Sequence, residues 1–110
     1  MLISESTTEL TASSNSANKG SSVTLTCVVK GIPAPSKPVL TKRVSGSTTN
    51  IDMTCSGTTT KTCKKVFSSA VYTDSGNYTC NGENLIDGDR KSSSDTLTLS
   101  IGKWMGINVG

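Results

Sequence analysis

The chain has 110 residues, a net charge of +3 and no histidine. This length suits one domain and leaves no room for two. Hydrophobic residues make up only 33% of the chain and aromatic residues 4%, so a thin core is expected. The small charge argues against a nucleic-acid partner, because nucleic-acid-binding domains carry clustered basic residues and a higher pI.

Four cysteines in a small, Ser- and Thr-rich chain favour two disulfides and an oxidising compartment. Such crosslinks would support the thin core. Four reduced, buried thiols in a cytosolic domain are the alternative. Zinc is a third interpretation, which the absence of His and of a Cys-x-x-Cys pair disfavours. We therefore predict no metal site and no cofactor.

No apolar run in the sequence approaches the ~20 residues that span a bilayer, so no direct membrane insertion is predicted. The charged start and apolar stretch that mark a signal peptide are also missing. If the domain is extracellular, the chain is expected to be a mature fragment of a longer protein. Residues 103–110 contain the single Trp of the chain. They are interpreted as a linker, the start of a following domain or a foreign tail.

Short alternations of apolar and polar residues, separated by Gly, Ser, Asn or Pro, predict β-strands along the chain. Residues 22–29 form the clearest strand, since their four apolar positions fall on one face. The pattern predicts an all-β, two-sheet antiparallel sandwich of seven or eight strands. The other predicted strands are 2–11, 39–44, 51–55, 62–68, 76–80 and 95–101, with a loop at 13–20 and a turn at 56–61.

The segment 74–80 has the most specific pattern in the chain. It reads Asp-Ser-Gly-Asn-Tyr-Thr-Cys, which resembles the D-x-G-x-Y-x-C signature of strand F in immunoglobulin-superfamily domains. Residues 20–27 resemble strand B of the same family. Residues 31–35, Gly-Ile-Pro-Ala-Pro, resemble the entry to strand C in intermediate-set domains. The resemblance covers about residues 5–101 and implies an immunoglobulin-like domain over residues 1–102.

The resemblance implies structural roles for residues of this motif. Tyr78 would form a tyrosine corner, with its ring in the core and its hydroxyl bonded to backbone near Asp74. Gly76 belongs to the same motif. The resemblance also implies an inter-sheet disulfide, Cys27–Cys80, whose spacing suits the intermediate set.

One position departs from the family pattern. Strand C of the family usually carries a Trp that packs on the inter-sheet disulfide. Here Leu40, or alternatively Val39, would fill that space with less buried area.

The remaining cysteines, Cys55 and Cys63, lie outside the family pattern and flank a predicted turn. Alternation places each of them on one face of its own strand, so the two can face each other in a hairpin. Opposite residues in a hairpin have Cβ atoms about 4.5–5.5 Å apart, and a disulfide needs about 3.8 Å. A small adjustment would suffice, so we predict a second disulfide, Cys55–Cys63.

Common catalytic patterns are missing, so we predict that the chain is not an enzyme. The lack of His removes Ser-His-Asp and Cys-His catalysis. No phosphate-binding glycine motif occurs. Asp87-Gly88-Asp89 resembles half of a calcium site, but the further ligands of an EF-hand loop are missing. A glycine-containing turn is the favoured interpretation.

Asn77-Tyr78-Thr79 matches the acceptor motif for N-glycosylation. Asn77 has the opposite parity to Tyr78 and is therefore expected to face solvent. Asn77 is accordingly predicted as a glycosylation site, with an unmodified surface Asn as the alternative.

The family resemblance implies a protein-recognition or cell-adhesion module of a cell-surface receptor or a secreted immune-type protein. Its partner would be a protein, bound homophilically or heterophilically. A structural spacer in a multidomain ectodomain is one alternative. An anionic-glycan-binding module that uses Lys61, Lys64 and Lys65 is another. An intracellular muscle-type domain is disfavoured by the second cysteine pair and the glycosylation motif.

Residues 81–91 are predicted to form the loop between strands F and G, and this loop is our predicted partner-binding surface. Leu85 and Ile86 are apolar where a turn does not require apolar residues. The alternative is that both pack back on the sandwich. The predicted partner-binding residues are Leu85, Ile86, Asp87, Asp89, Arg90 and Lys91.

Overall fold

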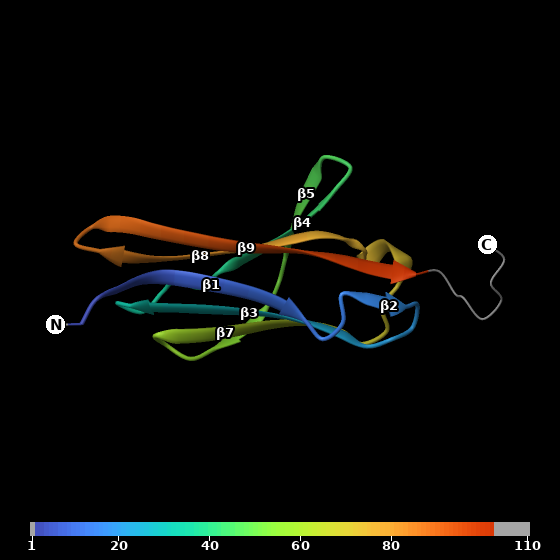
Figure 1. The fold of residues 1–110 in the computed structure, drawn as a ribbon, viewed down its shortest axis with the longest axis horizontal. Helices are drawn as coiled ribbons and strands as arrows, with labels where there is room; N and C mark the ends of the chain where they lie inside the picture. The colour runs from blue at the N-terminus through green and yellow to red at the C-terminus, as the bar shows by residue number, and fades with distance from the viewer. Residues whose placement is uncertain (1, 103–110) are drawn as a thin grey trace.

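A computed structural model describes residues 2–102, which form a sandwich of two β-sheets (Figure 1). Met1 and the predicted tail at 103–110 lie outside the described residues. One 3-10 turn, η1 (Tyr72–Asp74), accompanies the strands. The strands are β1 (Ser4–Ala12), β2 (Ser16–Asn18), β3 (Val23–Ile32), β4 (Val39–Val44), β5 (Ser47–Ile51), β6 (Thr54–Ser56), β7 (Thr60–Phe67), β8 (Gly76–Ile86) and β9 (Asp89–Gly102).

One sheet has the strand order β1-β3-β7-β6, and the other has the order β2-β9-β8-β4-β5. All pairings are antiparallel except that of the short β2 with β9. This confirms the predicted all-β sandwich. The three proline residues near β4 lie before the strand, where a missing N–H does not interrupt the ladder.

The core lies between the two sheets and is crossed by the predicted disulfide Cys27–Cys80, which joins β3 to β8. Leu40 is fully buried and is the direct neighbour of Cys80 across β4 and β8, so an aliphatic side chain occupies this position. The Tyr78 ring packs edge-on against Phe67, with the ring centroids 6.2 Å apart. Apolar burial of this kind stabilises by about 25 cal/mol per Å².

Two predicted boundaries are wrong for one physical reason each. The predicted strand 51–55 is divided, because Ile51 ends β5 in one sheet and Cys55 lies in β6 of the other. The chain crosses between the sheets at Asp52 and Met53. The predicted loop 13–20 contains β2, which pairs with β9 through backbone groups that side-chain patterns do not reveal. The described residues therefore contain nine strand segments instead of seven or eight.

The predicted F–G loop at 81–91 is also wrong. β8 continues to Ile86, and β9 begins at Asp89. Asp87 and Gly88, with φ of +52° and +83°, form a two-residue turn between them. Two positive φ values identify a type I′ turn, whose twist matches that of the flanking strands. The proposed flexible loop is therefore the end of a long β-hairpin (Figure 1).

Candidate functional site

The β8–β9 turn and the loop 33–36 lie together at one end of the sandwich, which we call the hairpin end. Leu85 is the most exposed large apolar residue there, with 56% of its surface accessible. It borders a groove of about 210 Å³ that is also lined by Pro33, Ala34 and Pro35. The backbone N–H of Ser36 donates to the carbonyl of Glu83 at 3.1 Å, which ties the loop to the hairpin. The hairpin end thus presents an exposed leucine beside an apolar-walled groove.

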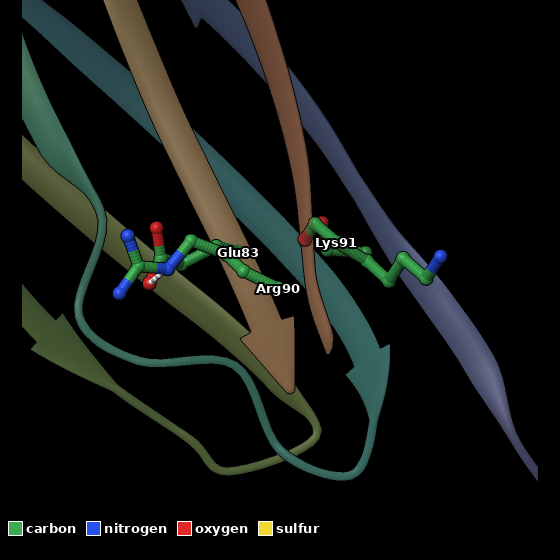
Figure 2. Close-up of polar contacts among 4 residues, drawn as sticks. Glu83, Arg90 and Lys91 are labelled. Atoms are coloured by element: carbon green, nitrogen blue, oxygen red, sulfur yellow. Dashed lines mark hydrogen bonds and ion pairs between the residues drawn. The ribbon is translucent and has the colours of Figure 1, made fainter. Parts of the chain in front are cut away.

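The predicted partner-binding residues divide between the two faces of the hairpin, because side chains alternate along a strand. Leu85 and Arg90 are direct neighbours across β8 and β9 and share the outer face. Figure 2 shows the Lys91 side chain pointing away from Arg90. Asp87, Asp89 and Arg90 are exposed, whereas Ile86 and Lys91 are partly buried.

A cross-strand ion pair lies beside Leu85 on this outer face. The Arg90 Nε atom is 3.0 Å from the Glu83 Oε2 atom (Figure 2). The two side chains are 68% and 38% exposed, so the pair contributes at most about 1 kcal/mol to stability. Its consequence is geometric, since it holds two long charged side chains next to the exposed leucine.

Beneath the hairpin end, a polar seam formed by Ser6, Thr8, Asn84 and Ser93 fills the space between β1 and the β8–β9 sheet. Asn84 is only 2% exposed. Its Oδ1 atom accepts from the Ser6 N–H at 3.1 Å, and its Nδ2 atom donates to the carbonyls of Ser4 at 2.9 Å and Pro33 at 3.0 Å. One amide therefore fixes the hairpin, β1 and the loop 33–36 to one another.

Hydroxyl groups complete the polar seam. The Ser93 Oγ atom lies 3.0 Å from Ser6 Oγ and 2.6 Å from Thr8 Oγ1. Ser6 Oγ also donates to the Lys91 carbonyl at 2.8 Å. A buried polar group is tolerated when its hydrogen bonds are made. No buried side-chain N or O atom among the described residues lacks a partner.

Gly82 lets β8 approach the opposite sheet closely next to this seam. A Cβ atom at this position would lie 2.6 Å from Val29 Cγ1 and 2.7 Å from Thr8 Oγ1, closer than packed atoms allow. Sequence analysis missed Gly82, Asn84 and Ser6 as structural residues, because isolated Gly, Asn and Ser are also typical of loops.

At the opposite end of β8, Tyr78 is fully buried and its hydroxyl donates to the backbone carbonyl of Asp74. Burial, and secondarily the Asp74 charge, raises the pKa of Tyr78 to about 12. The Asp74 carboxylate accepts from the Val71 N–H at 2.9 Å. Gly76 begins β8 at a close approach, since a Cβ there would lie 3.0 Å from Val44 Cγ2. These contacts place the motif residues in the fold and not on a binding surface.

Asn77 is exposed on the outer face of the five-stranded sheet, where its Oδ1 atom accepts from Thr98 Oγ1 at 2.7 Å. The three lysines proposed for glycan binding do not lie on one face of β7. Strand alternation separates Lys64 from Lys61 and Lys65. The Lys65 ammonium lies 5.3 Å from the Phe67 ring centroid, a cation–π contact.

The second predicted disulfide, Cys55–Cys63, joins directly opposite residues of β6 and β7. Cys63 is fully buried and is also the direct neighbour of Cys27 across β7 and β3. The two disulfides therefore lie side by side in the sheet, and the second one extends into the core. Within residues 2–102, no group of three or more His, Cys, Asp or Glu side chains is arranged to hold a metal ion. No helix in this part of the chain is long and apolar enough to cross a membrane.

Comparisons with known proteins agree with this architecture. The sequence profile of the immunoglobulin domain family matches residues 7–84, and the chain therefore belongs to that family. Members of the family generally act as binding or structural modules and not as enzymes. Among curated protein sequences, none matches the chain significantly.

Several solved structures share the fold. A titin domain in complex with obscurin-like 1 gives a TM-score of 0.65 at 17% identity, covering 93% of this chain and 97% of that one. The full ectodomain of mouse nectin-like molecule 4 gives a TM-score of 0.65 at 21% identity, covering 98% of this chain and 33% of that one. Titin domains in complex with telethonin give 0.61 at 19% identity, covering 93% and 49%. Identities this low show the fold alone.

Proposed function

We propose that this chain is an extracellular protein-recognition module that presents the hairpin end to a partner protein. The observation that carries the proposal is Leu85, a large apolar side chain that is 56% exposed on a rigid β-hairpin. Apolar side chains beside a groove, with charged groups around them, are typical of the centre of an interface. The polar seam holds this surface in place before binding, which lowers the entropic cost of association.

The proposed compartment rests on the cysteines. All four are joined in disulfides, and none is free in the described part of the chain. Disulfides of this kind persist in oxidising environments. The similar titin structures come from complexes with obscurin-like 1 and telethonin, and the nectin-like structure is an ectodomain. These neighbours support a protein partner for this fold without deciding the compartment.

We further propose that Asn77 carries an N-linked glycan when the chain is made in a secretory host. Asn77 is exposed, and it lies on the same strand as Leu85 at a distance of about 26 Å along β8. A glycan there would cover the outer face of the five-stranded sheet and leave the hairpin end open. Peptide mapping of secreted protein before and after amidase treatment tests the modification, and an unmodified Asn77 peptide would contradict it.

The recognition proposal is tested by assembling the biotinylated chain on streptavidin and measuring the binding of the tetramer to a panel of intact cells. Leu85→Asp should reduce binding at least about tenfold, because it places a charge in the centre of the surface. Val66→Asp is the matched control, since Val66 is 55% exposed on the other sheet. Equal loss in both variants would contradict the proposal. Absence of binding to every cell type would favour a spacer. Binding that salt abolishes and that Leu85→Asp leaves intact would favour the anionic-glycan alternative.

A further inference from the structure

β5 is the outermost strand of the five-stranded sheet, and one side of its backbone pairs with no strand among residues 2–102. Proteins usually protect such edges with charged residues, proline, bulges or very short strands. β5 has five residues, Ser-Thr-Thr-Asn-Ile, with no charge and no proline. The other edge strands are protected, since β1 carries Glu5 and Glu9, and β2 and β6 have three residues each. β5 is therefore an unprotected strand edge.

An apolar groove lies on the inner face of the β4–β5 hairpin, which projects away from the sandwich in Figure 1. The groove measures about 450 Å³ and is lined by Val44, Ile51 and Tyr72, among others. Val44 is 45% exposed and Tyr72 is 56% exposed. The Lys42 ammonium donates to the Thr73 carbonyl across the groove, which directs its charge away from the strand edge.

We infer that β5 pairs antiparallel with β5 of a second copy of this chain, with the two-fold axis at Thr49. In this register Thr48 of one copy faces Asn50 of the other, and Ser47 faces Ile51. Opposite residues of an antiparallel pair share a face of the sheet. Each Ile51, partly buried in one chain, therefore meets the β4–β5 groove of the other copy. On the outer face, the Thr48 and Asn50 side chains are placed to exchange hydrogen bonds.

A second copy suits this edge better than a charged segment does, because β5 offers no ionic partner. The pairing is self-complementary and closed, so association stops at a dimer. The net charge of +3 on each copy opposes association only weakly, since charges beyond about 8 Å are largely screened at physiological salt. The inference uses β5 and the β4–β5 groove and does not rest on the role proposed for Leu85.

Sedimentation velocity of the whole chain, from low micromolar to millimolar concentration, tests the inference. The unsubstituted chain should form a reversible dimer. Thr49→Asp places two carboxylates opposite each other at the two-fold axis and should raise the dissociation constant at least about tenfold. Within its own hairpin the new carboxylate faces Lys42, so the monomer should fold normally. Thr11→Asp, an exposed position on the edge strand of the other sheet, should leave the dimer intact.

A charge exchange separates edge pairing from any loss of folding. Thr49→Lys alone should also weaken the dimer, whereas an equimolar mixture of Thr49→Asp and Thr49→Lys chains should form a heterodimer. The inference is overturned by a chain that stays monomeric at every concentration, which would leave the edge to a different partner or to none. It is equally overturned if Thr49→Asp dimerises normally, if Thr11→Asp weakens the dimer as much, or if the mixture stays monomeric.

Discussion

At the end of the sandwich near η1, the two sheets meet through fully buried apolar side chains such as Val23, Leu25 and Tyr78. At the hairpin end they meet through the polar seam, where the amide of Asn84 and the hydroxyls of Ser6 and Ser93 form the contacts. One end is held by non-directional burial, and the other is held by directional hydrogen bonds. A chain with few apolar residues can therefore extend a sandwich beyond its apolar core.

The difference in chemistry predicts a difference in response to substitution. An apolar core loses stability in proportion to the volume removed, and neighbouring side chains relax partly into the space. A satisfied polar network fails more sharply, because the loss of one partner leaves other buried groups without hydrogen bonds. Substitutions at the two ends should therefore differ in which part of the domain they loosen.

The largest effect is expected at the apolar end, from replacing Cys27 and Cys80 by Ser. The Cys27–Cys80 bond closes a loop of 53 residues, so its loss should cost about 4 kcal/mol in the chain-entropy model. Replacing Cys55 and Cys63 by Ser opens a loop of 8 residues and should cost about 2–3 kcal/mol. Thermal melts and secreted yields of the two double variants measure the order. A more damaged Cys55/Cys63 variant would show that the second disulfide is the main crosslink of the core.

At the hairpin end, Asn84→Leu should cost about 2–4 kcal/mol, because it leaves the Ser6 N–H and two carbonyls without their partner. Asn81→Leu is the control, since Asn81 is exposed on the same strand, and it should change stability by less than about 0.5 kcal/mol. Denaturant unfolding of both variants gives the values. Similar small losses in both would show that the polar seam does not hold the two sheets together.

A smaller effect is expected from Tyr78→Phe, which removes the hydroxyl bonded to the Asp74 carbonyl and should cost about 1–3 kcal/mol near neutral pH. Tyr72→Phe, at an exposed ring, serves as the control. Unchanged melting of the Tyr78 variant would contradict a structural role for the hydroxyl.

The same residue predicts a dependence on alkaline pH. The pKa of Tyr78 is raised to about 12 in the fold, above the unfolded value of about 10, so the fold favours the protonated phenol. The resulting stabilisation is complete below pH 10 and is lost as the pH rises from about 10 to about 12. Unfolding free energies across that window should fall more steeply for the unsubstituted chain than for Tyr78→Phe. Parallel curves would contradict the raised pKa.

How far the sequence predicts this fold follows the same division. The strand around Val23 and Leu25 and the motif at Tyr78 are readable, because apolar alternation and a specific motif mark them. The ends of β8 and β9 are not readable, because Asn84 and Ser93 are as typical of loops as of strands. Their strand conformation depends on hydrogen bonds to β1, which is distant in sequence. The ion pair of Arg90 with Glu83 depends on the register that the Asp87–Gly88 turn sets, and no sequence pattern states that register.

Amide hydrogen exchange over residues 81–91 tests most directly whether the polar seam holds the hairpin end as a rigid surface. In the unsubstituted chain these amides should be protected, although less than those of Val23–Val29 in the core, because stability differs between regions of one domain. In Asn84→Leu, protection over residues 81–91 should fall strongly while the protection of β3 changes little. Rapid exchange of residues 81–91 in the unsubstituted chain would contradict this account, since that behaviour belongs to a mobile loop.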